Sequence, residues 1–140
     1  MATKKIFLTR GTTYTTPSDW GSPWSVEVIG AGGNGALAGI STIGDGGGGG
    51  GAYSKITDSD ATISASQVVY FAIAAANTST TASNTWLNVS VNSVPATTAA
   101  GVLAKGGVRG NETGTGAGGA GGTAAASVGA TKYSGGSGGN

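Results

Sequence analysis

The sequence predicts an all-β fold: a β-sandwich-like domain with long glycine-rich loops. Short runs of alternating apolar and polar residues recur along the chain, separated by Gly, Asn, Ser and Thr, which are typical of turns. No window of about 11–18 residues repeats apolar residues at the i, i+3, i+4 spacing of an amphipathic helix. Glycine accounts for 29 of the 140 residues, far above its usual share of about 7%, and predicts the long loops.

The first half of the chain contains three candidate strands. Residues 5–8 form a short β-prone run, and residues 24–29 alternate so that Trp24, Val26 and Val28 share one face. Residues 30–51 are a glycine-rich insertion that ends in six consecutive glycines. The sequence "AYSKI" at residues 52–56 then predicts a strand that follows the insertion.

The second half adds further strands and then loses its large side chains. Residues 61–64 and 68–74 predict two strands, and the apolar character of the second indicates burial on both faces. Residues 84–92 alternate with Leu87, Val89 and Val91 on one face, and residues 101–107 supply one more short strand. We therefore expect a β-sandwich domain at residues 1–105, with the glycine-rich loop 30–51 inserted in it. Residues 106–140 are expected to form a glycine-rich extension. Its last residues, "SGGSGGN", stop within their pattern, and the sequence leaves open whether the extension continues after Asn140.

Composition excludes several classes of function. Seven basic and six acidic residues give a net charge of +1, with no basic footprint for nucleic acid and no polybasic patch for a membrane surface. The chain has no cysteine and no histidine, which argues against disulfides, zinc sites and histidine acid–base catalysis. The apolar runs are too short for a signal peptide or a membrane span. We expect no enzyme activity, no cofactor, no membrane insertion, and synthesis in the cytoplasm without a leader.

The segment "VIGAGGNG" satisfies the dinucleotide-binding pattern G-x-G-x-x-G through Gly30, Gly32 and Gly35. That interpretation requires a helix after Gly35, but the next ten residues contain two glycines and lead into six more. Each glycine inside a helix costs about 1 kcal/mol relative to alanine. In so glycine-rich a chain the pattern is expected from composition alone, and nucleotide binding is the least favoured hypothesis.

Two further sets of residues carry a functional and a structural interpretation. Asp58 and Asp60 could form an acid–base pair, but their Ser/Thr-rich surroundings favour a solvated turn. Four aromatic residues could stack on sugar rings, although aromatics in such a protein are more often core anchors: Tyr14, Trp20, Tyr53 and Tyr133. The sequence does not indicate which of them would contact a ligand.

The glycine runs have two interpretations. They could be flexible linkers, or they could pack side by side as polyglycine-II-type helices with three residues per turn. We expect the packed arrangement, in which glycine allows backbones to approach closely. Replacing Gly48 and Gly49 with valine should then destabilise the protein by several kcal/mol. The structural glycines predicted in this way are Gly30, Gly32, Gly33, Gly35, Gly46, Gly47, Gly48, Gly49, Gly50 and Gly51.

The chain resembles the glycine-rich domain of bacteriophage tail-fibre and adhesin proteins. The resemblance runs in order through "TPSDW", "WSVEVIGAGGNG", "GGGGGGAYSKI", "ATISASQVVYFAIAAA", "TWLNVS" and "AAGVLAKGG". Its specific part is "VEVIGAGGNG" followed by "GGGGGGAYSKI". The family usually has Pro-Gly before its central strand and Val-Gly-Ala-Gly-Gly after it. Here residues 64–67 read "SASQ" and residues 73–77 read "IAAAN".

The resemblance implies a structural protein of the virion, in a fibre or adhesin that takes part in host attachment and receptor binding. The alternative is a head fibre or decoration protein carried on the capsid. The implied partners are other virion proteins and a host-surface receptor or glycan. The apolar supply of the chain is thin, so it is expected to gain stability by self-association, and the fibre resemblance favours a homotrimer.

Overall fold

The structure is a computed structural model, and it describes residues 4–36, 46–75, 83–111 and 116–139. These residues form seven strands and contain no helix, so the predicted all-β fold is confirmed. The strands are β1 (Thr13–Thr15), β2 (Ser25–Ile29), β3 (Tyr53–Thr57), β4 (Val68–Ala72), β5 (Thr85–Asn88), β6 (Gly101–Ala104) and β7 (Thr131–Tyr133).

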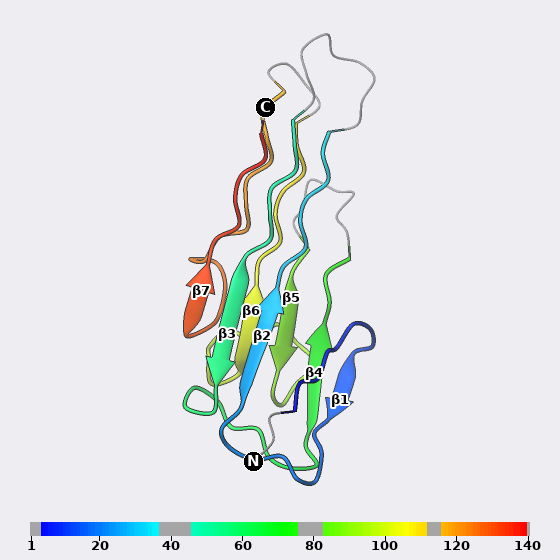
Figure 1. The fold of residues 1–140 in the computed structure, drawn as a ribbon, viewed down its shortest axis with the longest axis vertical. Coiled ribbons are helices and arrows are strands. Elements are labelled where there is room, and N and C mark those ends of the chain that lie inside the picture. Colours follow the sequence, from blue (N-terminus) through cyan, green and yellow to red (C-terminus); the bar gives the residue numbers. More distant parts are fainter. Residues whose placement is uncertain (1–3, 37–45, 76–82, 112–115, 140) are drawn as a thin grey trace.

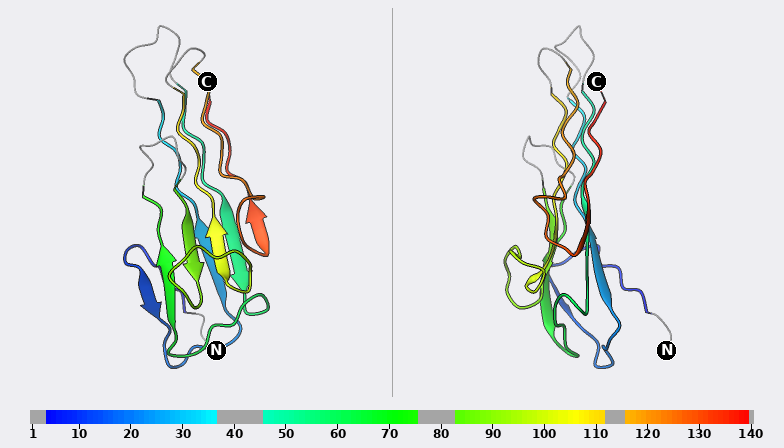
Figure 2. Two further views of the ribbon diagram at one scale, coloured as in Figure 1. Left: turned by 180° about the vertical axis from the view of Figure 1, so that it is seen from behind. Right: turned by 90° about the vertical axis from the view of Figure 1, so that its left-hand side faces the viewer.

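The strands form two antiparallel sheets that pack face to face (Figures 1 and 2). One sheet has the order β1-β4-β5-β6 and the other has the order β2-β3-β7. Strands β2 and β3 of the smaller sheet pack over β5 and β6 of the larger one. The smaller sheet keeps β2 and β3 in register from Ser25 opposite Thr57 to Ile29 opposite Tyr53.

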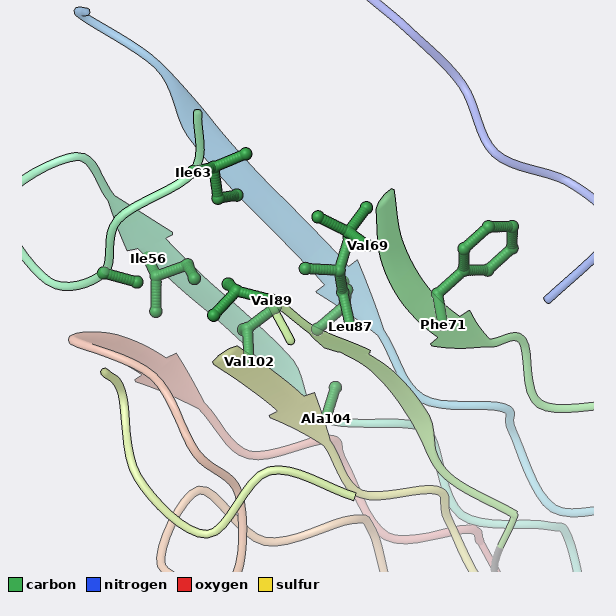
Figure 3. Packing of buried hydrophobic residues seen from close by; sticks show 10 residues of the cluster. Ile56, Ile63, Val69, Phe71, Leu87, Val89, Val102 and Ala104 are labelled. Carbon is green, nitrogen blue, oxygen red and sulfur yellow. The ribbon is translucent and has the colours of Figure 1, made fainter. Parts of the chain in front are cut away.

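The core lies between the sheets and consists mainly of branched aliphatic side chains (Figure 3). Ile56 and Val102 are fully buried, and Val28, Phe71 and Leu87 join them from three other strands. Leu8, Tyr14 and both Trp20 and Trp24 are only partly buried where they pack against this cluster. The core is therefore small, as the thin apolar supply of the sequence indicates.

The chain leaves one end of the sandwich in several extended segments that run side by side (Figure 1). Four strands lead directly into or out of these segments: β2, β3, β6 and β7. The segments contain most of the glycines of the chain. The molecule thus has two parts, a sandwich held by side chains and a glycine-rich extension.

The strand predictions were correct for β2, β3, β4, β5 and β6 and wrong for two other runs. Residues 5–8 and 61–64 form no strand, because neither run pairs with a strand of the described residues. Strand β1 lies instead at the threonine-rich residues 13–15, and β7 pairs with β3 from a region with few large side chains. That region, residues 106–140, contributes both to the smaller sheet and to the extension.

The apolar sequence of β4 predicted burial on both faces, but only one face of the strand is buried. Val69 and Phe71 point into the core, whereas Val68 and Ala72 lie on the other face and are at least partly exposed. No second layer covers that outer face in the described residues, so β4 follows ordinary in-and-out alternation.

The apolar face predicted for residues 84–92 is also interrupted. Leu87 and Val89 are buried, but Val91 is exposed. Asn88 is buried and folds the chain into a turn: its side-chain oxygen accepts hydrogen bonds from the N–H groups of Ser90 and Val91, and its amide donates to the carbonyl of Ser93. A side chain that bonds to the following backbone favours a turn, so β5 ends at Asn88.

Candidate functional site

The extension contains five glycine-rich segments, which we number by their order in the chain. Segment I comprises residues 30–36, segment II residues 46–52, segment III residues 105–111, segment IV residues 116–122 and segment V residues 135–139. All five run alongside one another beyond the sheets (Figures 1 and 2). They are the candidate functional site, because they include every glycine that the sequence singled out.

Segments I and II are antiparallel and bond at every third residue. The N–H groups of Gly30, Gly33 and Ala36 donate to the carbonyls of Ala52, Gly49 and Gly46, with N···O distances of 2.8 to 2.9 Å. A β-ladder would use every second residue instead. The spacing of three is the turn length of a polyproline-II helix, which has no internal hydrogen bonds and must bond to its neighbours.

Segment II also bonds to the three other segments with the same spacing. The N–H groups of Gly47 and Gly50 donate to segment V, at the carbonyls of Gly139 and Gly136. Those of Gly49 and Ala52 donate to segment III, and the carbonyls of Gly47 and Gly50 accept from segment IV. Segment II therefore lies at the centre of the extension.

The outer segments bond to one another as well. Val108 of segment III donates to Ala120 of segment IV, and Gly138 of segment V donates to Gly119 of segment IV. Gly107 and Gly110 of segment III donate to segment I. Every segment thus has at least two hydrogen-bonded neighbours, and these distances also lie between 2.8 and 3.0 Å.

Close backbone contacts explain why segment II begins with six glycines in succession. A Cβ at Gly46 or Gly49 would overlap carbonyl groups of segment IV. One at Gly48 or Gly51 would overlap segment I. Gly46, Gly48, Gly49 and Gly51 thus each face a backbone that leaves no room for a side chain.

The third direction of segment II is tight but less severe. A Cβ at Gly47 would lie 3.3 Å from atoms of Gly139, and one at Gly50 would lie 3.4 Å from Gly136. The run Gly46 to Gly51 therefore lies in direct contact with residues 30–35 and with the C-terminal glycines. The alternative, that the run is a flexible linker, does not fit these contacts.

Segments at the periphery carry side chains on the positions that face outward. Asn34 of segment I, Ala120 of segment IV and Ser137 of segment V are exposed. The number of glycines per turn thus follows the number of neighbouring backbones. Several glycines of segments III, IV and V also face a neighbouring segment, and their step of three was a usable signal, but they were not singled out from the sequence. They are Gly107 and Gly110, Gly118 and Gly121, Gly119 and Gly122, and Gly135 and Gly138.

The four predicted glycines of segment I do not have equal roles. A Cβ at Gly30 or Gly33 would overlap the backbone of segment III. A Cβ at Gly32 or Gly35 would lie 3.6 or 3.7 Å from a carbonyl of segment II, which is an ordinary contact. Only the first pair is required by close packing.

The same geometry bears on the G-x-G-x-x-G pattern. A dinucleotide site needs backbone N–H groups that point to the pyrophosphate at a helix N-terminus. Here the N–H groups of Gly30 and Gly33 donate to segment II, and residues 37–45, where the helix would lie, are outside the described residues. The two donors are engaged in the packing of the extension.

The two aspartates occupy a turn after β3. The side chain of Asp60 accepts hydrogen bonds from the N–H and the hydroxyl of Thr57, at 2.8 and 2.9 Å. Asp58, Asp60 and Ala61 line a shallow depression there together with Val89 and Ala99. The carboxylate of Asp60 thus holds the turn, in agreement with the structural interpretation.

The four aromatic residues separate into two pairs. Tyr14 and Trp20 pack against the core, as anchors do. Tyr53 and Tyr133 lie on the outer face of the smaller sheet, with ring centroids 5.8 Å apart. Burial, and then the charge and hydrogen bond of Glu27, raise the pKa of Tyr53, and Tyr133 adds a smaller effect.

Within residues 4–36, 46–75, 83–111 and 116–139, no group of three or more acidic, histidine or cysteine side chains is placed to bind a metal. The same residues include no helix that is long and apolar enough to cross a bilayer. No protein-family model, curated protein or solved structure matches the chain.

Proposed function

We propose that the protein is a structural component of a bacteriophage fibre or adhesin and takes part in host attachment. The observation that carries this proposal is the glycine-rich extension, in which five backbone segments bond to one another at every third residue. Such an arrangement has no apolar core of its own and projects from the sandwich (Figure 1). It is suited to holding part of the chain away from the body of the protein.

We assign the extension to polyglycine-II-type packing, in agreement with the resemblance to phage glycine-rich domains. The spacing of three in the hydrogen bonds and the glycines at close approaches support this assignment. The ends of segments I, II, III and IV that lie far from the sheets are joined by residues 37–45 and 112–115. Because the hydrogen bonds between segments involve backbone groups, the far end can differ between proteins without changing the interior.

The partners in this proposal are further copies of the chain, other virion proteins and a receptor or glycan on the host surface. A homotrimer fits a small core and the edge strands β1 and β2, each of which pairs with one strand only among the described residues, since identical subunits can cover such edges. Analytical ultracentrifugation should give three times the mass of the chain at micromolar concentration. A stable folded monomer at that concentration would contradict the trimer.

Labelling of intact virions tests the proposed location. Antibodies raised against this chain should decorate the tail fibres in electron micrographs of purified particles, and the free protein should compete with particle adsorption to host cells. Labelling of the capsid without competition would instead support the alternative, a head fibre or decoration protein. Failure to label any particle would contradict both.

The nucleotide hypothesis has a separate test. A ligand that binds the native state raises the melting temperature by mass action. We expect millimolar NAD or ATP to leave the melting temperature unchanged, because the N–H groups of Gly30 and Gly33 are bonded to segment II. A concentration-dependent increase would favour a nucleotide site over this assignment.

A further inference from the structure

The N-terminal arm, residues 4–11, projects from the sandwich without backbone partners. None of its groups forms a hydrogen bond or an ion pair with any other described residue. Leu8 packs against the core and anchors the arm, whereas Phe7 is 83% exposed. The right-hand view of Figure 2 shows the arm pointing away from the smaller sheet. The exposed ring of Phe7, on a segment without hydrogen bonds to the rest of the described protein, is available for contact with a partner.

The outer face of the smaller sheet carries an apolar row at its upper end. Ile29 lies opposite Tyr53, and Tyr53 lies opposite Tyr133, so the three side chains cross the sheet side by side. Ile29 is 66% exposed and Tyr133 is 64% exposed. We name these three residues the tyrosine row. Phe7 and two members of this row, Ile29 and Tyr133, are the three most exposed large apolar side chains among the described residues.

The charges of the two features are complementary. The arm carries Lys4 and Lys5 next to Phe7 and has no acidic residue. The strand pair next to the tyrosine row carries Glu27, which remains half-exposed in its ion pair with Lys55. A lysine can also lie over a tyrosine face, an attraction between the cation and the ring. The arm therefore matches the row in both apolar surface and charge.

Within one chain, the arm does not contact the tyrosine row. Phe7 makes no ring contact with Tyr53 or Tyr133, and its exposure shows that nothing in the described residues covers it. An arm and a row on the same chain can instead meet between copies, each arm on the row of the next copy. Such a head-to-tail contact closes into a ring when the rotation between copies allows it.

We propose that the arm of one copy binds the tyrosine row of a second copy, with Phe7 against Ile29, Tyr53 and Tyr133. This inference rests on the self-association included in the proposed function and not on the location in a virion. Phe7 supplies the apolar contact, and Lys4 and Lys5 lie near Glu27. The ring so formed is the proposed homotrimer.

Cross-linking between differently tagged copies tests the contact directly, because the chain has no cysteine of its own. A Phe7→Cys chain with one tag is mixed with a Tyr133→Cys chain with a second tag, under mild oxidation. We expect a disulfide-linked species that carries both tags. A Val94→Cys chain is the matched control, since Val94 is also exposed but lies away from the row, and it should give no such species.

A charge placed at the contact gives an independent measurement. Phe7→Asp should weaken self-association about tenfold or more in sedimentation equilibrium, as removal of a central anchor does. Val94→Asp should leave it unchanged. An assembly that forms normally with Phe7→Asp, or that gives no cross-link between positions 7 and 133, overturns this surface but leaves the trimer. A wild-type monomer overturns both, and binding of that monomer to anionic vesicles through the arm would identify a membrane as its partner instead.

Discussion

Gly49 and Gly136 differ in what an added methyl group would meet. A Cβ at Gly49 would overlap the carbonyl of Ala120, whereas one at Gly136 has no other atom within 4 Å. Neither glycine has a positive φ, so the comparison isolates packing. Gly49→Ala should lower the free energy of unfolding by at least about 2 kcal/mol, because backbone must move to admit it. Chemical denaturation measures the change.

Gly136→Ala is the matched control, and it should leave the free energy of unfolding unchanged or raise it by about 0.5 kcal/mol through the lower entropy of the unfolded chain. Equal effects of the two substitutions would contradict the packed arrangement of segment II. The valine substitutions at Gly48 and Gly49 test the same arrangement with a larger side chain, since a Cβ at Gly48 would overlap Gly33.

Two buried hydroxyl groups make a second comparison at the same scale. The hydroxyl of Ser54 is buried and forms no hydrogen bond with any described residue. The hydroxyl of Thr16 donates to the carbonyl of Ser64 at 2.6 Å and accepts from the N–H of Gln67 at 2.9 Å. Ser54→Ala should therefore raise the free energy of unfolding by about 1 kcal/mol, and Thr16→Val should lower it by about 1–3 kcal/mol. Thermal denaturation of both variants would show opposite shifts, and shifts of the same sign would contradict these assignments.

The smaller sheet provides a prediction at the level of elements. Burial and Glu27 of the neighbouring strand raise the pKa of Tyr53, so the folded state retains the phenolic proton to higher pH than the unfolded state. Its contribution to stability is complete below a pH of about 10 and is lost as the pH rises through the pKa of the folded state. Glu27→Gln should lower the pKa of Tyr53, since it removes the charge that opposes ionisation.

Ultraviolet titration of phenolate absorbance, with Tyr53→Phe as the reference for the other tyrosines, measures that pKa. Asp19→Asn is a control that removes a carboxylate distant from β3 in the chain, and it should leave the pKa of Tyr53 unchanged. If Glu27→Gln also leaves it unchanged, the carboxylate of Glu27 does not act on the hydroxyl of Tyr53, and this assignment is wrong.

The sequence alone was sufficient to locate those strands whose own residues alternate between apolar and polar. Alternation located β2, β3 and β5 because one face of each lies on the core. It did not locate β1 or β7, since three-residue strands of threonine, tyrosine and lysine form only where β4 and β3 offer an edge. Among the glycines, composition indicated close packing for residues 46–51. The partners of each glycine depend on how distant segments meet, which no local pattern contains.

At the level of the whole molecule, the C-terminal residues link the sheet to the extension. Strand β7 covers the edge of β3, and segment V accepts hydrogen bonds from Gly47 and Gly50. A chain that ends at Ala130 loses both sets of contacts. We expect its free energy of unfolding to fall by more than about 3 kcal/mol, since backbone N–H groups of segment II and of β3 lose their hydrogen-bond partners.

Removal of residues 1–7 is the control for that truncation. These residues precede Leu8, and those of them that the structure describes form no hydrogen bonds, so the free energy of unfolding of the monomer should stay within about 0.5 kcal/mol. Hydrogen exchange would report the same difference locally: the amides of Gly47 and Gly50 should exchange faster only in the chain that ends at Ala130.

The three-residue spacing of the hydrogen bonds limits how the length of the extension can change. Inserting one or two residues into segment I would rotate Gly30 and Gly33 away from segment III and turn side chains toward a neighbouring backbone. Adding three residues to segment I and three to segment II keeps every face in phase and lengthens the pair by one turn, about 9 Å. Insertions and deletions compatible with folding should therefore come in multiples of three within paired segments. Outside the segments no such rule applies, so length can vary there one residue at a time.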